Sequence, residues 1–363
     1  MSLRSVVTCA LLVLCSAQFL AADVSIVERR AAKKVLAKDK PQHNHSGSKA
    51  KGSVTLIDSG GLQYFINTDI TFSTSSNASG AMSEASYTAA VNATTSAGGV
   101  TSSTLSDAFD GYNALCVSLT GTLAQCGTGD PNFTIYNQTG AAPTAECGGR
   151  QYVFPAQAIG GLSVSRKIFV PTNDQFARWL NIFTNTTGAP ISFSMVTSNN
   201  LGSDTNTRIV SSSNGNNAAE LTDTWVSTFQ NYTGKTTSDP RLGHVLQGVG
   251  VANPVSGIHF ADGDDNPWWG YSITLGPGQT TIIMNFVTGQ PSKAAANAKA
   301  AQIVPLPPTT VQCLSVTERN EISNFPAQQN VVQVPTLGDL GLAALAVALT
   351  AAGLLALRRR AVA

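Results

Sequence analysis

The stretch ISFSMVTS, residues 191–198, decides the fold class. Apolar and polar residues alternate along it, with Ile191, Phe193 and Met195 set against Ser192 and Ser194. A period of two places the apolar set on one face of a β-strand. Four stretches of similar character predict further strands: GLQYFINTDITFST (61–74), NALCVSLT (113–120), RKIFVP (166–171) and TIIMNFV (281–287).

Glycine-containing turn sequences separate these strands, and no long helical pattern intervenes between them. This order favours a β-sandwich over a doubly wound sheet. Two stretches, IFTNTTGAPISFSM (182–195) and SITLGPGQTTIIMNFV (272–287), resemble the hairpins of bacterial Ig-like surface modules. The sequence therefore predicts a mainly β ectodomain over residues 53–326, an Ig-like or larger sandwich, with a subdivision near residue 149 as an alternative.

Two short helices are predicted near the end of this β region. PSKAAANAKAAQIV (291–304) is rich in alanine. Ser315 and Glu318 have the spacing of a capping box, which opens a helix towards Phe325. A tether of residues 327–339 follows.

Charge is distributed unevenly, although the formal net charge is +1. Residues 23–52 carry eight basic and three acidic side chains, whereas residues 53–335 carry ten basic and seventeen acidic ones. The first segment is predicted to be a flexible basic linker. The acidic and sparsely charged remainder argues against a nucleic-acid partner.

Both ends of the chain have the composition of membrane-targeting segments. Residues 1–22 combine Arg4, a short apolar region and small residues for cleavage, as in a signal peptide. Residues 340–357 carry no charge, and a helix of that length at ~1.5 Å per residue nearly spans a ~30 Å bilayer core. Residues 358–363 form a basic cytoplasmic tail, in which a stop-transfer signal is predicted at Arg358, Arg359 and Arg360.

The segment before this apolar stretch resembles a known sorting signal. Val334-Pro335-Thr336-Leu337, followed by Leu340-Gly341, an Ala/Leu helix and three arginines, is similar to the IPTL-type C-terminal signals of Gram-negative bacteria. That pattern runs Ile-Pro-Thr-Leu-x-x-Trp-Gly, so Val334 replaces Ile and Leu340 replaces Trp. Pro335 blocks helix formation and favours an extended Val334, a shape that a peptidase can bind.

The resemblance implies a substrate of an exosortase-like membrane peptidase. The precursor would be anchored in the inner membrane with its ectodomain in the periplasm, and the processed protein would reach the cell surface or the medium. The expected partners are the membrane, the peptidase, and glycans or envelope polymers. The expected role is structural or adhesive, without enzymatic activity.

Four cysteines remain outside the signal peptide: Cys116, Cys126, Cys147 and Cys313. In an exported chain an even number predicts disulfides, and four cysteines allow three pairings. The favoured pairing is Cys116–Cys126, because CVSLTGTLAQC has the pattern of a hairpin, which leaves Cys147–Cys313. Zinc is disfavoured, because no Cys-x-x-Cys spacing occurs.

The densest polar cluster is HFADGDDNPWWGY, residues 259–271. Oxygen ligands for Ca²⁺ would come from Asp262, Asp264 and Asp265, and the faces of Trp268 and Trp269 would stack on sugar rings. The simpler interpretation is an acidic loop between two strands, with the tryptophans covering the edge of the core. NLGSDTNT (200–207) is a second loop of this type.

No arrangement of residues predicts a catalytic site. His244 and His259 are the only histidines in residues 53–326, and no serine lies in a G-x-S-x-G motif. Apart from Ca²⁺, no cofactor is expected. The alternative function is a carbohydrate-binding module or a secreted glycan-active enzyme that uses the 259–271 stretch.

Overall fold

The computed structural model describes residues 52–68, 78–94, 99–127, 129–136, 142–230 and 239–326. The described residues all belong to one compact unit that ends at Pro326, and the second unit, residues 327–363, lies outside them. The predicted signal peptide, nearly all of the basic linker, the sorting motif and the apolar segment also lie outside them. Among the described helices, none has the length and apolar character needed to cross a bilayer.

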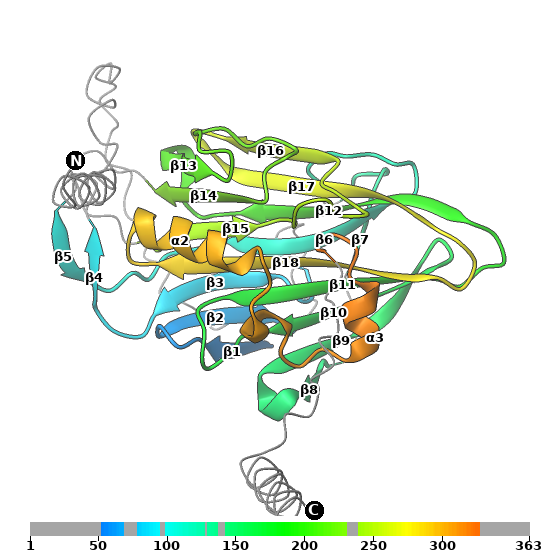
Figure 1. Ribbon diagram of the computed structural model, residues 1–363, viewed down its shortest axis with the longest axis horizontal. Helices are drawn as coiled ribbons and strands as arrows, with labels where there is room; N and C mark the ends of the chain where they lie inside the picture. Colours follow the sequence, from blue (N-terminus) through cyan, green and yellow to red (C-terminus); the bar gives the residue numbers. More distant parts are fainter. Residues whose placement is uncertain are drawn as a thin grey trace, which may run out of the picture. The chain divides into compact units, whose positions relative to one another are not determined.

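Two antiparallel sheets make up most of the described chain (Figure 1). The first has the order β1 (Ser53–Ile57), β2 (Leu62–Asn67), β3 (Met82–Tyr87), β6 (Gly111–Ser118), β12 (Ile191–Asn200), β17 (Asp264–Leu275) and β16 (Gly257–Ala261), with β7 (Thr134–Ile135) also paired to β6. The second has the order β13 (Thr207–Ser212), β14 (Trp225–Gln230), β15 (Arg241–Val245), β18 (Thr280–Gln290), β11 (Ala177–Asn185), β10 (Leu162–Phe169), β9 (Gln151–Ile159) and β8 (Thr144–Glu146). A separate two-stranded ribbon consists of β4 (Val91–Thr94) and β5 (Val100–Ser103). The prediction of a mainly β, sandwich-like chain is confirmed.

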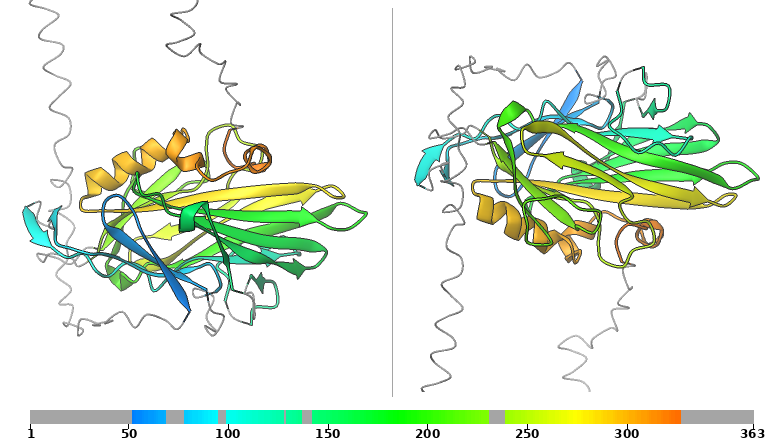
Figure 2. Two further views of the ribbon diagram at one scale, coloured as in Figure 1. Left: turned by 90° about the horizontal axis from the view of Figure 1, so that it is seen from below. Right: turned by 90° about the horizontal axis from the view of Figure 1, so that it is seen from above.

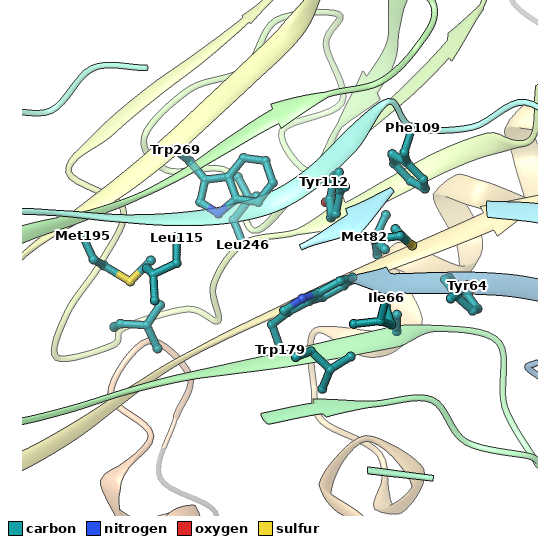
Figure 3. Packing of buried hydrophobic residues seen from close by; sticks show 14 of the residues in the cluster. Tyr64, Ile66, Met82, Phe109, Tyr112, Leu115, Trp179, Met195, Leu246 and Trp269 are labelled. Carbon is teal, nitrogen blue, oxygen red and sulfur yellow. The ribbon is translucent and has the colours of Figure 1, made fainter. Parts of the chain in front are cut away.

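The main hydrophobic core lies between the two sheets. Trp179 of β11 and Trp269 of β17 point into it from opposite sheets, and both are fully buried (Figure 3). The ring of Tyr112 packs against both indoles, with centroid distances of 5.6 Å to Trp179 and 6.1 Å to Trp269. The alternation seen in ISFSMVTS is realised here, because Phe193 and Met195 face this core.

A helical layer covers the outer face of the second sheet (Figure 2). It consists of α2 (Lys293–Ile303), the 3-10 turn η5 (Pro308–Val311) and α3 (Val316–Glu321). Strand β18 is therefore buried on both sides, with Ile283 in the core between the sheets and Met284 against the helical layer. This explains its almost continuous apolar run. The capping box of Ser315 and Glu318 is present as predicted.

Both predicted hairpins are wrong. β11 and β12 belong to different sheets, as do β17 and β18, so each turn carries the chain from one sheet to the other. The apolar faces of the flanking strands pack across the core, as the rings of Phe183 and Phe193 do at 5.1 Å. The buried Asn185 links the two turns, since its Nδ2 donates to the carbonyls of Ala189 and Leu275 at 2.7 and 3.0 Å.

The predicted cysteine pairing is confirmed. Cys116 pairs with Cys126 and Cys147 with Cys313, with Cα–Cα distances of 6.4 and 5.9 Å. The hairpin predicted over residues 116–126, which suggested the first pair, is wrong. Strand β6 ends at Ser118, and the chain from there to Cys126 forms no strand.

Candidate functional site

The 259–271 stretch is part of a tight strand pair rather than a loop. β16 ends at Ala261, a two-residue turn follows, and β17 begins at Asp264. Gly263 in this turn has a φ of 85°, a value that glycine adopts without steric cost. We call β16, the turn and β17 the edge hairpin, because β16 is the last strand of the first sheet (Figure 1).

The pleat of β17 separates the two tryptophans. Trp269 points into the core, where its ring stacks on Phe260 with a centroid distance of 5.8 Å and an interplanar angle of 9°. Trp268 is half-buried and lies on the opposite face of the strand. Only Trp268 is therefore placed to meet a ligand from solvent, and the proposed role of Trp269 in ligand stacking is wrong.

Polar groups surround Trp268 on the outer face of the edge hairpin. His259 is its register partner on β16, and the two rings lie 6.4 Å apart at an interplanar angle of 18°. The Nε2 of His259 lies 2.9 Å from Oδ2 of Asp264, and these side chains are 42% and 40% exposed. Burial raises the pKa of Asp264, but hydrogen bonds from His259 and from the backbone N–H of Asn266 outweigh it and leave the pKa lowered.

The three aspartates of the stretch do not converge on one point. Asp262 accepts a hydrogen bond from the backbone N–H of Ile209 at 2.8 Å, whereas Asp264 is bound to His259. Asp265 is buried, and burial raises the pKa of its carboxyl. Among the described residues, no group of three His, Cys, Asp or Glu side chains is placed to hold a metal ion. A Ca²⁺ site stays a prediction.

The second Asx-rich loop, residues 200–207, does lie against the edge hairpin. The backbone N–H of Asp204 donates to Oδ2 of Asp265 at 3.0 Å, and the N–H of Leu201 donates to the carbonyl of Asp265 at 2.7 Å. The N–H of Gly263 donates to the carbonyl of Thr207 at 2.9 Å. These bonds anchor the tip of the edge hairpin to residues 200–207.

The sequence did not predict that the Cys116–Cys126 loop would join this surface. The backbone N–H of Cys126 donates to Oγ of Ser198 on β12 at 2.9 Å, which ties the loop across the outer face of the first sheet. Leu123 then lies over Gly257 and Gly270, which are register partners in the edge hairpin. Glycines that face one another on paired strands mark a close approach of another segment, but the local sequence assigns neither Gly257 nor Gly270 to a strand, so this signal becomes readable only once the pairing is known.

His244 lies in the interior of the sandwich. Its Nδ1 is 2.8 Å from the Tyr112 hydroxyl and its Nε2 is 2.9 Å from Oγ1 of Thr228. Burial lowers the pKa of His244 to about 3, so the ring is neutral at ordinary pH. It is fully buried and stacks against Tyr112, which makes it an internal hydrogen-bonding residue of the core.

Comparison with known proteins identifies no family. No protein-family model matches the chain, and no curated protein matches it. Solved structures do match, among them a polysaccharide lyase at 11% identity and a TM-score of 0.34, covering 66% of this chain and 34% of the lyase. A galactose mutarotase-like protein from Lactobacillus casei matches at 8% identity and a TM-score of 0.36, covering 65% of this chain and 99% of that one.

These matches correct one expectation from the sequence. The chain was expected not to be an enzyme, yet the solved structures that it matches include a polysaccharide lyase and a galactose mutarotase related enzyme from Lactobacillus acidophilus. This chain spans only about a third of the lyase. At TM-scores below 0.5, the matches assign no particular activity to it.

Proposed function

We propose that this protein binds a carbohydrate on the outer face of the edge hairpin. The observation that carries the proposal is the half-buried Trp268 ring, which lies beside His259 on a solvent-facing strand surface. A flat aromatic ring offers apolar area at low entropic cost, and the polar groups around such a ring give specificity. The Asp264 carboxylate accepts hydrogen bonds from hydroxyls, and the Asn266 amide both donates and accepts them.

A binding screen with two matched variants tests this proposal. Wild type, Trp268→Ala and Trp225→Ala are run through gels that contain single polysaccharides and over a glycan array. Trp225 is the control, because it is also half-buried but lies on β14 of the second sheet. Retention is expected for wild type and Trp225→Ala and is expected to be lost in Trp268→Ala. Equal retention of Trp268→Ala would refute the site.

The same incubations are assayed for new reducing ends, for unsaturated products and for a change of anomeric composition. Turnover that disappears with Trp268→Ala would extend the proposal from binding to catalysis at this face. Circular dichroism of each variant confirms that the fold is retained.

We also propose that the protein is exported and anchored through its C-terminal segment before processing. The observations that favour this are the Val334-Pro335-Thr336-Leu337 motif ahead of an uncharged stretch, and two disulfides, which form in oxidising compartments. Mass spectrometry of the mature protein is expected to find a C-terminus near Thr336. A mature protein that still contains Arg358, Arg359 and Arg360 would contradict processing.

A further inference from the structure

The Cys116–Cys126 loop is fixed at both of its ends. One end continues from the central strand β6, and the other is held by the disulfide and by Ser198, whose Oγ accepts from the Cys126 N–H and donates to Cys126 Sγ at 3.2 Å. Within the loop, the N–H of Thr122 donates to Oγ of Ser118 at 3.1 Å. The loop therefore presents its intervening residues in one place on the sheet.

Leu123 occupies a slot that two glycines leave open. A Cβ added at Gly270 would lie 2.7 Å from Cδ2 of Leu123, 2.8 Å from the carbonyl oxygen of Met195 and 2.9 Å from Cγ2 of Val196, so a side chain here would displace Leu123 and clash with β12. A Cβ added at Gly257 would lie 3.0 Å from Cβ of Leu123 and also 3.0 Å from Cζ3 of Trp268. Leu123 and the Trp268 indole thus border the same small space from two sides.

We propose that Leu123 is the positioning residue for Trp268 and forms the apolar second wall of the carbohydrate site. This inference rests on the proposed function. Because Leu123 and the indole both approach the Cβ position of Gly257 to 3.0 Å, the half-buried Leu123 limits the directions in which the indole can turn, while His259 flanks the ring on the hairpin itself. An indole fixed before binding loses less conformational freedom when a sugar ring stacks on it. The disulfide acts on the site through Leu123.

The test compares Leu123→Ala with the space-filling variant Leu123→Met, using the polysaccharide that wild type retains. Leu123→Ala is expected to weaken binding about tenfold, which corresponds to ~1.4 kcal/mol. Leu123→Met is expected to restore most of the affinity, since it refills the slot. A thermal melt of each variant separates this effect from loss of fold. If Leu123→Ala binds as wild type does while Trp268→Ala fails to bind, the positioning role is overturned and the proposed function stands.

A second readout needs no ligand. Acrylamide quenching of tryptophan fluorescence reports the accessibility of Trp268, because Trp179 and Trp269 are fully buried and Trp225 can be replaced by Phe in the background. Leu123→Ala is expected to increase quenching, and the increase should vanish when Trp268 is also replaced by Phe. If wild type binds no glycan but this increase is seen, the proposed function fails and the positioning of Trp268 is supported. Unchanged quenching would overturn the positioning role in either case.

Discussion

Asn324 and Met284 form a reciprocal pair. The Met284 N–H donates to Oδ1 of Asn324 at 2.8 Å, and Nδ2 of Asn324 donates to the Met284 carbonyl at 2.7 Å. Strand β11 pairs with β18 at Met284 on one side, but on the other side β15 pairs with β18 only from Phe286 to Gln290, so among the described residues no strand lies beside Met284 on that side. The fully buried Asn324 side chain continues the hydrogen bonding of the sheet at this point, just before the described chain ends.

Replacing Asn324 by Ala is expected to lower the free energy of unfolding by about 3 kcal/mol. The substitution leaves the buried Met284 N–H without this acceptor, and it removes a further bond from Nδ2 to the Leu246 carbonyl. Urea unfolding at neutral pH measures the loss. Asn132→Ala is the control, because the exposed Asn132 side chain donates to the nearby Asp130 carboxylate rather than to a buried backbone group. Equal stability of the two variants would show that the pair contributes little.

The two disulfides are expected to differ in their contributions to stability. Cys147–Cys313 joins residues 166 apart in the sequence, and Cys116–Cys126 joins residues 10 apart. In the chain-entropy account the first constrains the unfolded chain by about 5 kcal/mol and the second by about 3 kcal/mol. Denaturant unfolding of the Cys147→Ser/Cys313→Ser and Cys116→Ser/Cys126→Ser double variants measures this difference. A larger loss from the shorter loop would show that native contacts of the Leu123 loop, rather than loop length, dominate.

Asp58 is expected to make stability fall as pH rises through the acid range. Burial raises the pKa of its carboxyl to about 6, although hydrogen bonds from Leu62, Tyr64 and Gly60 act in the opposite direction. The folded state therefore binds this proton more tightly than the unfolded chain does, which adds to the free energy of unfolding. This stabilisation is fully present below about pH 4 and is lost as pH rises through about 6. The difference amounts to about 3 kcal/mol.

Unfolding of wild type and Asp58→Asn at pH 4, 5, 6 and 7 checks this sign. The stability of the variant relative to wild type is expected to increase with pH over this interval, because only wild type loses the contribution. Asp130→Asn, which makes the same chemical change beside a turn at residues 131–132, is measured alongside as the matched control. A constant difference between Asp58→Asn and wild type would contradict the raised pKa.

His244 is expected to make stability fall as pH is lowered, which is the opposite of the effect of Asp58. Its pKa is lowered to about 3 by burial, so the folded state favours the neutral ring. Its contribution is present above the unfolded value of about 6.5 and is lost as pH falls towards 3. His244→Asn should therefore gain stability relative to wild type as the solution is acidified from pH 7 to pH 4. Urea unfolding of wild type and His244→Asn at pH 7, 6, 5 and 4 measures this change, and a constant difference between the two would contradict the lowered pKa of His244.

Local patterns predicted individual elements well. The period of two in residues 191–198 gave strand β12, the capping box at Ser315 gave α3, and even cysteine count with spacing gave both disulfides. These features depend on neighbours in the sequence or on few alternatives. The sheet to which a strand belongs depends instead on contacts across the whole fold. For that reason the local sequence predicts hairpins at β11–β12 and β17–β18, where the structure has turns between two sheets.

In the candidate site, too, local sequence indicated the segment, whereas the fold decided which of its side chains face solvent. The sequence drew attention to residues 259–271, and the pleat then separated Trp268 from Trp269 and Asp264 from Asp265. A bulge or a one-residue change of register would have reversed which tryptophan faces solvent. The proposed positioning role of Leu123 depends on a contact between segments more than a hundred residues apart. In the sequence, this contact is reflected in the two glycines at 257 and 270.

The most direct test of the account is an NMR titration that follows the indole N–H signals of the four tryptophans. The signal of Trp268, assigned with Trp268→Phe, is expected to shift progressively as the retained oligosaccharide is added, while the signals of the fully buried Trp179 and Trp269 stay in place or move little. A Trp268 signal that remains unmoved at saturating sugar, or a response centred on Trp225, would contradict binding at the edge hairpin.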